Sequence, residues 1–244
     1  MDESLASVVC SDHGTRPSAF VCQHLVAGSG LGFHWASDSE TPDQLCPDAW
    51  CDRCEEAFQA EGEWNERSEA VAKIAMLCDR CYEAARERNW RQDMQAFEQL
   101  VLDATSYLTA RQAALKAEFR LADYERYDWY QETGQLVFSQ HGKARVIADI
   151  QFVGSVSSAS DTWLWAWANE SFLETVRADV RKVREYGTDR QFLRLASARW
   201  KATEVDGWEM TAVAALLLKT QGAYRSPSER GATFMMLNDV RWVQ

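Results

Sequence analysis

The sequence predicts an α+β protein in which a small zinc-bound N-terminal module is joined by a long helix to an antiparallel sheet packed with helices. Three observations lead to this fold class. Residues 1–89 are rich in cysteine and in loop-forming Gly and Pro, residues 79–121 repeat apolar side chains at a helical period, and residues 127–168 carry strand patterns followed by helices. Because strands and helices occupy separate stretches, layered α+β packing is expected. The predicted domains are residues 1–89 and 90–244.

Two C-x-x-C pairs in the first domain indicate a metal site. They are Cys51-Asp-Arg-Cys54 and Cys78-Asp-Arg-Cys81. A short C-x-x-C loop lets two thiolates approach one ion, and two such loops supply the four ligands of a tetrahedral zinc ion. We therefore predict a structural zinc held by Cys51, Cys54, Cys78 and Cys81.

A second set of potential ligands lies upstream, as Cys10-x-x-His13 and Cys22-x-His24. In a strand, residues two apart point the same way, so Cys22 and His24 could bind one ion together. We predict a second structural zinc at these four residues. Disulfides are the alternative for clustered cysteines, but Met1-Asp-Glu-Ser begins no signal sequence. A cytoplasmic location is therefore expected.

Two further donors remain open. Cys46 is either outside both sites or the fourth ligand in place of a histidine. His34 is expected at the surface or in packing, although it stays a candidate ligand. Four ligands close a zinc site, whereas a catalytic zinc keeps one position for water. The sequence also lacks H-E-x-x-H, P-loop and G-x-S-x-G motifs, so the prediction leans away from an enzyme.

Charge is concentrated in the first domain, where residues 1–89 hold 17 Asp or Glu against 7 Lys or Arg. Proteins that bind nucleic acid use basic surfaces to displace phosphate counterions, so nucleic-acid binding is not expected. An acidic surface suits a basic protein partner, or it is simply solvated. No apolar run approaches the ~20 residues that span a bilayer, so no membrane association is expected.

In the first domain, strands are expected near Phe20–Leu25 and Val71–Leu77. The helical pattern that follows runs from Asp79 to about Leu121 without Pro or Gly, with a kink or break near Trp90 or Thr105.

From residue 127 onward, alternating patterns and turn signals predict strands. The predicted strands are Tyr127–Tyr130, Leu136–Phe138, Val146–Val153, Asp161–Ala168, Gly222–Ser226 and Gly231–Val240. Ser171-Phe-Leu-Glu174 has the pattern of a capping box, which would open a helix to about Tyr186 that Gly187 stops. Another helix is expected from Asp206 to about Gln221.

Three tryptophans alternate in Trp163-Leu-Trp165-Ala-Trp167-Ala-Asn169-Glu170. On a strand they would share one face. That face is either core beneath a second layer or a partly open aromatic platform for a ligand or protein partner. Asn169 and Glu170 would end the strand, and either cap it or contribute to such a site.

This motif, with Val153-Gly-Ser155 before it and Gly222-Ala-Tyr-Arg-Ser-Pro227 after it, resembles a bacterial domain family of unknown function. That family is marked by a W-x-W-A-W-A-N strand followed by a helix, and ends in a Y-R-x-P element. The resemblance covers residues 90–244 and implies an α+β domain without an assigned activity. The N-terminal segment is similar to small C-x-x-H-G, C-x-H and double C-x-x-C modules fused to bacterial proteins. Some neighbours of such domains are immunity proteins of toxin systems.

The leading hypothesis is a non-enzymatic, zinc-stabilised protein that binds a protein partner. The resemblance implies an immunity protein that neutralises a toxin, and the acidic first domain suits a basic toxin. The alternative is an enzyme or small-molecule binder that uses the tryptophan face with Glu170 and Arg225. Arg225 would then read a ligand; otherwise it forms a structural ion pair with Glu170 or Asp161.

Overall fold

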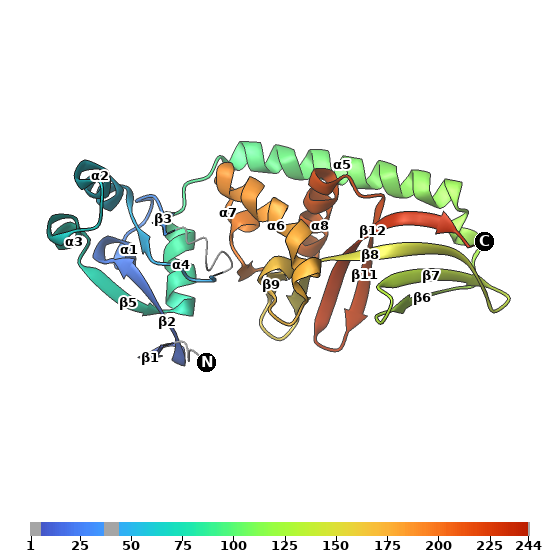
Figure 1. Cartoon of the computed structure of the whole chain (residues 1–244), viewed down its shortest axis with the longest axis horizontal. Coiled ribbons are helices and arrows are strands. Elements are labelled where there is room, and N and C mark those ends of the chain that lie inside the picture. Colours follow the sequence, from blue (N-terminus) through green and yellow to red (C-terminus); the bar gives the residue numbers. More distant parts are fainter. Residues whose placement is uncertain (1–5, 37–43, 244) are drawn as a thin grey trace. The chain divides into compact units, whose positions relative to one another are not determined.

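The computed structural model describes residues 6–36 and 44–243. The chain divides into two compact units, Met1–Gln92 and Asp93–Gln244 (Figure 1). Both combine helices with mainly antiparallel strands, so the α+β class is confirmed.

The first unit extends to Gln92, beyond the end of helix α4 (Asp79–Asn89), because Trp90 and Arg91 both contact it. The Trp90 ring stacks on Trp35 with 5.0 Å between centroids. The Arg91 guanidinium donates two hydrogen bonds, of 3.0 and 2.7 Å, to the carbonyl oxygen of Gly30.

The first unit is a small sheet bordered by short helices. Its strands are β1 (Ser7–Cys10), β2 (Gly14–Cys22), β3 (His34–Trp35), β4 (Ala49–Trp50) and β5 (Ile74–Cys78). Its helices are α1 (Gln23–Ala27), α2 (Asp52–Glu61), α3 (Glu66–Ala72) and α4 (Asp79–Asn89). β2 is the central strand, because it pairs with β1 and β5 antiparallel and with β4 parallel. The predicted strand near Phe20–Leu25 ends earlier, since Cys22 is already the N-cap of α1.

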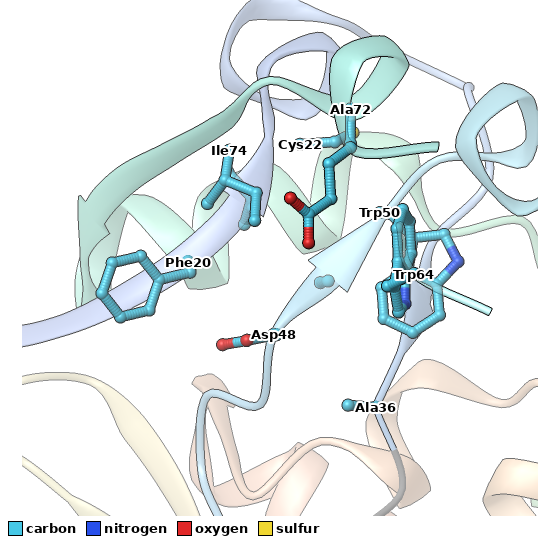
Figure 2. Close-up of a pocket in the computed structure, with 11 residues that line it drawn as sticks. Phe20, Cys22, Ala36, Asp48, Trp50, Trp64, Ala72 and Ile74 are labelled. Carbon is cyan, nitrogen blue, oxygen red and sulfur yellow. The ribbon is translucent and has the colours of Figure 1, made fainter. Parts of the chain in front are cut away.

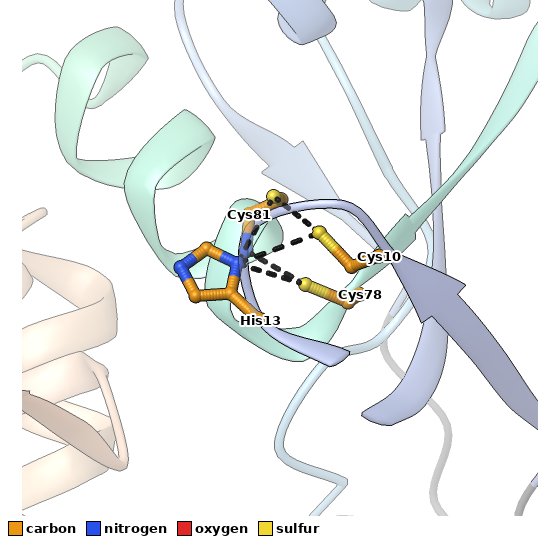
Figure 3. Close-up of side chains that lie close together, drawn as sticks. All are labelled: Cys10, His13, Cys78 and Cys81. Atoms are coloured by element: carbon orange, nitrogen blue, oxygen red, sulfur yellow. Dashed lines mark hydrogen bonds between the residues drawn. The ribbon is translucent and has the colours of Figure 1, made fainter. Parts of the chain in front are cut away.

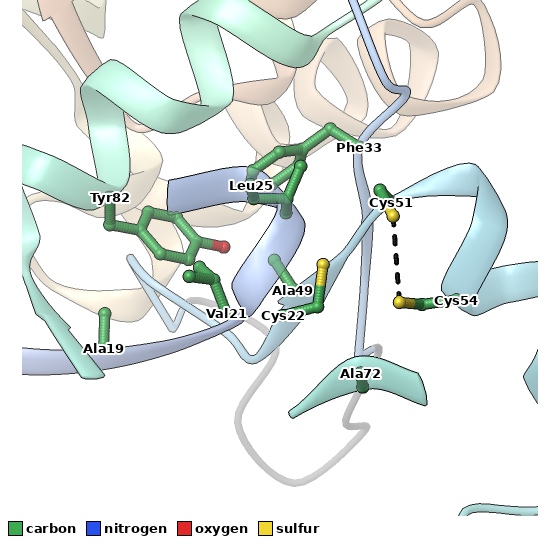
Figure 4. Close-up of a cluster of buried hydrophobic side chains, with 10 residues drawn as sticks. All are labelled: Ala19, Val21, Cys22, Leu25, Phe33, Ala49, Cys51, Cys54, Ala72 and Tyr82. Carbon is green, nitrogen blue, oxygen red and sulfur yellow. Dashed lines mark hydrogen bonds between the residues drawn. The ribbon is translucent and has the colours of Figure 1, made fainter. Parts of the chain in front are cut away.

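The core of this unit is small and contains cysteines among its apolar side chains (Figure 4). Val21, Leu25 and Tyr82 are almost fully buried. The Tyr82 ring meets Phe33 edge to face, and its hydroxyl donates to the carbonyl oxygen of Pro47 at 2.6 Å. So few apolar residues give a marginal core, which is the usual situation of domains stabilised by metal.

The second unit is built on one antiparallel sheet in the order β10-β9-β8-β12-β11, with β7 also pairing with β8 and β6 with β7. Its strands are β6 (Arg126–Tyr130), β7 (Gln135–Gln140), β8 (Lys143–Ser157), β9 (Thr162–Trp165), β10 (Arg199–Lys201), β11 (Gly222–Ser228) and β12 (Gly231–Trp242). Its helical segments are α5 (Met94–Glu118), η1 (Leu121–Asp123), η2 (Ala166–Ala168), α6 (Glu174–Asp189), α7 (Leu193–Ala196) and α8 (Glu204–Leu218). The predicted strands of this domain all have counterparts in the sheet.

Helices α8 and α5 cover the sheet, and α5 runs along it in Figure 1. The predicted break near Trp90 is confirmed: α4 ends at Asn89, and α5 begins at Met94, where the Asp93 side chain accepts a hydrogen bond from Ala96 N. Thr105 lies inside α5, which is not interrupted there. The buried residues of α5 follow the helical period; they are Phe97, Ala104, Leu108 and Leu115.

The capping box predicted at Ser171 is wrong. α6 begins at Glu174 with Leu173 as its N-cap, and Ser171 instead donates from its backbone N (3.1 Å) and hydroxyl (2.6 Å) to the Asn169 side-chain oxygen. Gly187 does not end the helix either, since α6 continues to Asp189. A β-carbon on Gly187 would lie 2.4 Å from that of Leu195, so this glycine permits close packing of α7.

Gly154 in β8 shows how tightly the sheet is packed over the tryptophans. A β-carbon there would lie 2.3 Å from Trp163 Cζ2 and 2.7 Å from the Leu164 carbonyl oxygen. We expect Gly154→Ala to destabilise the unit by about 1–3 kcal/mol, the usual range for overpacking, seen as a lower midpoint of thermal unfolding. Ser155→Ala on the same strand is the matched control and should change the midpoint little. An unchanged midpoint for Gly154→Ala would contradict this packing.

Candidate metal centres

The first group of potential ligands joins the β1–β2 turn to the start of α4 (Figure 3). His13 Nδ1 lies 3.5 Å from Cys10 Sγ, 3.5 Å from Cys78 Sγ and 3.6 Å from Cys81 Sγ. The sulfurs of Cys10 and Cys81 are 3.8 Å apart. The four donors therefore surround one point, although His13 is exposed and only Cys78 is buried.

The second group lies inside the core of the same unit and consists of Cys22, His24, Cys51 and Cys54. Cys51 and Cys54 sulfurs are 3.7 Å apart, and His24 Nδ1 lies 3.5 and 3.3 Å from them. All three cysteines are buried, and Figure 4 shows them beside the apolar side chains of the core. This centre is the more enclosed of the two.

Both donor sets fit zinc. In a tetrahedral site with zinc–sulfur bonds of about 2.3 Å and zinc–nitrogen bonds of about 2.0–2.1 Å, neighbouring donors are roughly 3.8 Å (S to S) or 3.6 Å (S to N) apart. The measured separations, 3.7–3.8 Å between sulfurs and 3.3–3.6 Å between sulfur and nitrogen, match these values. They are far longer than the ~2.05 Å of a disulfide. Each group could therefore hold one metal ion.

The structure combines the predicted ligands differently from the sequence prediction. Instead of one site from both C-x-x-C pairs, each C-x-x-C pair joins one upstream Cys/His pair. The outer pairs, Cys10/His13 and Cys78/Cys81, form one group and the inner pairs form the other, so the pairing is nested. The cause is strand pairing: β5 runs antiparallel to β2, with Ser18 opposite Cys78. Cys78 therefore lies toward the β1–β2 turn, away from the Cys22 end of β2.

The repeated C-D-R-C sequence forms the same local structure twice. Cys51 follows β4 and Cys78 is the last residue of β5; both have extended backbone angles and serve as the N-cap of a helix, α2 or α4. The Cys78 sulfur accepts a hydrogen bond from Cys81 N at 3.4 Å. The positive end of a helix dipole and free N–H groups favour a thiolate at this position. Both knuckles are thus suited to hold charged sulfur ligands.

The aspartate of each C-D-R-C knuckle connects it to another segment. Asp79 is buried and receives a bidentate ion pair from Arg16, with distances of 2.8 and 2.5 Å. This carboxylate raises the pKa of Arg16. Asp52 accepts from His34 Nε2 at 2.9 Å and forms an ion pair with Arg91 at 2.7 Å. Sequence reasoning missed these roles, although the repetition of Asp in both knuckles was a visible signal.

The thiol pKa values follow the surroundings of each sulfur. Hydrogen bonds from the Asp12 backbone and then from His13 lower the pKa of Cys10 to about 6. Burial, followed by neighbouring sulfurs, raises the pKa of Cys81 to about 12 and also raises those of Cys22 and Cys54. Crowded thiols cannot all ionise unless a cation compensates their charge. Metal binding at these sites should accordingly release protons.

The two donors left open by the sequence belong to neither group within the described residues. Cys46 is half-buried against the first unit's core. His34 binds Asp52, as described above, so it supports the α2 knuckle from outside. The eight predicted ligands therefore form two complete sets of four without either residue.

The tryptophan motif does not form an open platform. Trp163 and Trp165 are 0% exposed and Trp167 is 1% exposed, so all three belong to the core of the second unit. Only the first two lie on β9; Trp167 belongs to η2, where the strand has ended. The two β9 rings meet edge to face at 5.1 Å, and the Trp165 indole N–H donates to the Arg194 carbonyl oxygen at 2.8 Å.

The remaining predicted site residues are separated. The Asn169 side chain accepts hydrogen bonds from Ser171 in the turn before α6, and Glu170 is exposed. Arg225 pairs with Glu204 at 2.6 Å, and not with the predicted Glu170 or Asp161. Among the described residues, the buried tryptophans and the paired Arg225 therefore do not form the open ligand site that the alternative hypothesis requires.

The first unit has a surface hollow that sequence reasoning did not identify. It measures about 260 Å³ and lies beside β2, β4 and α3 (Figure 2). Its lining is largely apolar, with two carboxylates; the residues are Phe20, Val21, Cys22, Ala36, Asp48, Ala49, Trp50, Trp64, Glu69, Ala72 and Ile74. They come from five separate stretches of sequence, so no local motif marks the hollow.

Across the described residues, no helix combines the length and apolar character needed to cross a bilayer.

Comparison with known proteins adds a family but no activity. No curated protein and no solved structure matches the chain. Residues 98–240 match a family described as a family of unknown function (DUF6882), a range that contains the tryptophan motif and lies within the predicted resemblance. The chain therefore belongs to this family, DUF6882, through most of its second unit.

Proposed function

We propose that this protein is a non-enzymatic binding protein whose N-terminal unit is organised by two structural zinc ions and docks a protein partner. The observation that carries the proposal is the nested pair of complete four-donor groups. Four protein ligands complete the coordination sphere of a tetrahedral zinc ion and leave no position for a reacting water. Zinc would then contribute folding energy and present a rigid surface, rather than chemistry.

The surface that supports docking is an exposed apolar strip on β2 and β5, formed by Phe20, Ile74 and Met76. Phe20 lies directly opposite Met76 in the antiparallel ladder, and Ile74 is two residues before Met76, on the same face. Their exposed fractions are 38%, 62% and 53%. Three exposed large apolar side chains side by side on a small rigid sheet are typical of a protein interface.

The strip predicts the outcome of a binding experiment. Met76→Glu should abolish co-purification of the partner from the native source, because it places a charge in an apolar contact. Leu102→Glu, at an exposed apolar position on α5 (62%, against 53% for Met76), is the matched control and should retain the partner. Zinc content should stay at two ions in both variants. Partner recovery unaffected by Met76→Glu, or no partner recovered with the unaltered chain, would contradict the proposal.

The partner is proposed only as a protein. The toxin-neutralising immunity role implied by the resemblance is supported neither by the family match nor by the site geometry. Nucleic acid is disfavoured as a partner because the first unit is strongly acidic.

A further inference from the structure

The hollow beside the apolar strip combines aromatic walls with acidic groups. Figure 2 shows Phe20 and Ile74 on one side, Trp50 and Trp64 on the other, and Asp48 between them. The two tryptophans meet edge to face at 5.1 Å. The Trp50 indole N–H is already satisfied by Glu55, at 2.6 Å, so these rings offer apolar surface and π-faces.

Two carboxylates line the hollow, and no lysine or arginine does. Within the described residues, neither Asp48 nor Glu69 forms an ion pair or a side-chain hydrogen bond. Desolvation by the surrounding residues raises the pKa of Asp48 from its ordinary value. A carboxylate beside apolar walls, without a compensating cation, favours a positively charged ligand.

We propose that this hollow takes the lysine or arginine side chain of a partner peptide, with the peptide's neighbouring apolar residues on the Phe20–Ile74–Met76 strip. This inference rests on the proposed function and names the chemistry of its partner. The cationic end would lie near Asp48 and the aliphatic stem against the tryptophan rings.

Size and charge both favour this occupant. A hollow of about 260 Å³ is below the ~300–1,000 Å³ of sites for drug-sized molecules, and suits one long side chain. Aromatic faces attract ammonium and guanidinium groups, and Lys and Arg stems pack on apolar surface. The net negative charge of the first unit would also accelerate encounter with a basic segment.

The test is calorimetric titration of the zinc-loaded full chain with blocked peptides Ala-Leu-X-Leu-Ala, where X is lysine, arginine or norleucine. Norleucine keeps the aliphatic stem and removes the charge. We expect the lysine and arginine peptides to bind about tenfold more tightly than the norleucine peptide, as for a charge-assisted contact of ~1.4 kcal/mol. Added salt should reduce the difference.

Two variants test whether Asp48 is responsible for the preference for a charged peptide. Asp48→Asn should remove the preference for a charged peptide, whereas Glu87→Gln, an equal charge change on the exposed face of α4, should keep it. Zinc content of two ions in each variant verifies the fold. An equal loss in both variants would overturn the inference, because net charge alone would then explain binding.

The remaining outcomes separate this inference from the proposed function. Equal binding of the norleucine peptide overturns the cation preference but leaves protein binding intact. If no peptide binds although the Met76→Glu experiment reveals a partner, the hollow is not the contact. Butylamine binding as tightly as the lysine peptide would assign the hollow to free amines instead. Failure of both experiments removes the proposed function itself.

Discussion

Replacing Cys54 with serine is expected to reduce the zinc content from two ions to one and to unfold much of the first unit. Cys54 is fully buried within the core group, and its loss leaves three donors around the ion. Zinc binding contributes roughly 10–16 kcal/mol in zinc-finger peptides, far more than a small apolar core supplies. Elemental analysis and hydrogen exchange, peptide by peptide, measure the two effects. The second unit has its own core, so its amide groups should remain protected from hydrogen exchange.

Double variants test which ligands share an ion. Cys22→Ser with Cys54→Ser alters one nested group and should leave one zinc bound. Cys54→Ser with Cys78→Ser alters both groups and should leave none. The pairing expected from the sequence predicts the reverse for both combinations, so the measured stoichiometries decide between them. Cys46 belongs to neither group, so Cys46→Ser is the control and should retain two zinc ions.

The second large effect is expected at Trp163, the centre of the second unit's core. It is fully buried, meets Trp165 edge to face, and lies 5.7 Å from Phe234 between ring centroids. Trp163→Ala should destabilise this unit by about 3–5 kcal/mol, because it removes a large buried side chain and leaves a cavity. Hydrogen exchange of β8 and α8 measures this loss of stability separately from any change in the first unit.

Trp242→Ala is the matched control, since this ring is 52% exposed, and its cost should be below about 1 kcal/mol. Retained zinc in both variants would show that the first unit is unaffected. A Trp163→Ala protein with unchanged protection of β8 would contradict the assignment of this tryptophan to the core. It would also reopen the possibility of an aromatic platform.

Local sequence signals predicted most elements of the fold because each depends on nearby residues. The apolar period of residues 94–118 indicates a helix whatever lies around it, and the turn at Glu132–Gln135 separates two strands on local grounds. The capping-box prediction failed because a neighbouring side chain changed the local hydrogen bonds. Asn169 competes for the Ser171 hydrogen bonds, and Leu173 becomes the N-cap instead. A local motif therefore predicts correctly only where no neighbouring side chain offers a better partner.

The sequence alone determined the α+β class and indicated the eight Cys and His residues that the structure gathers into two groups able to hold a metal ion, because thiolate and imidazole chemistry and short spacings are local properties. Which of these residues lie in the same group was decided only by the tertiary structure, since the antiparallel pairing of β2 with β5 places Cys78 beside the β1–β2 turn. Burial of Trp163 and Trp165, and the meeting of Asp48 with Trp50 and Trp64, depend likewise on segments far apart along the chain. Such long-range juxtapositions arise from packing of whole elements, and no single stretch of residues encodes them.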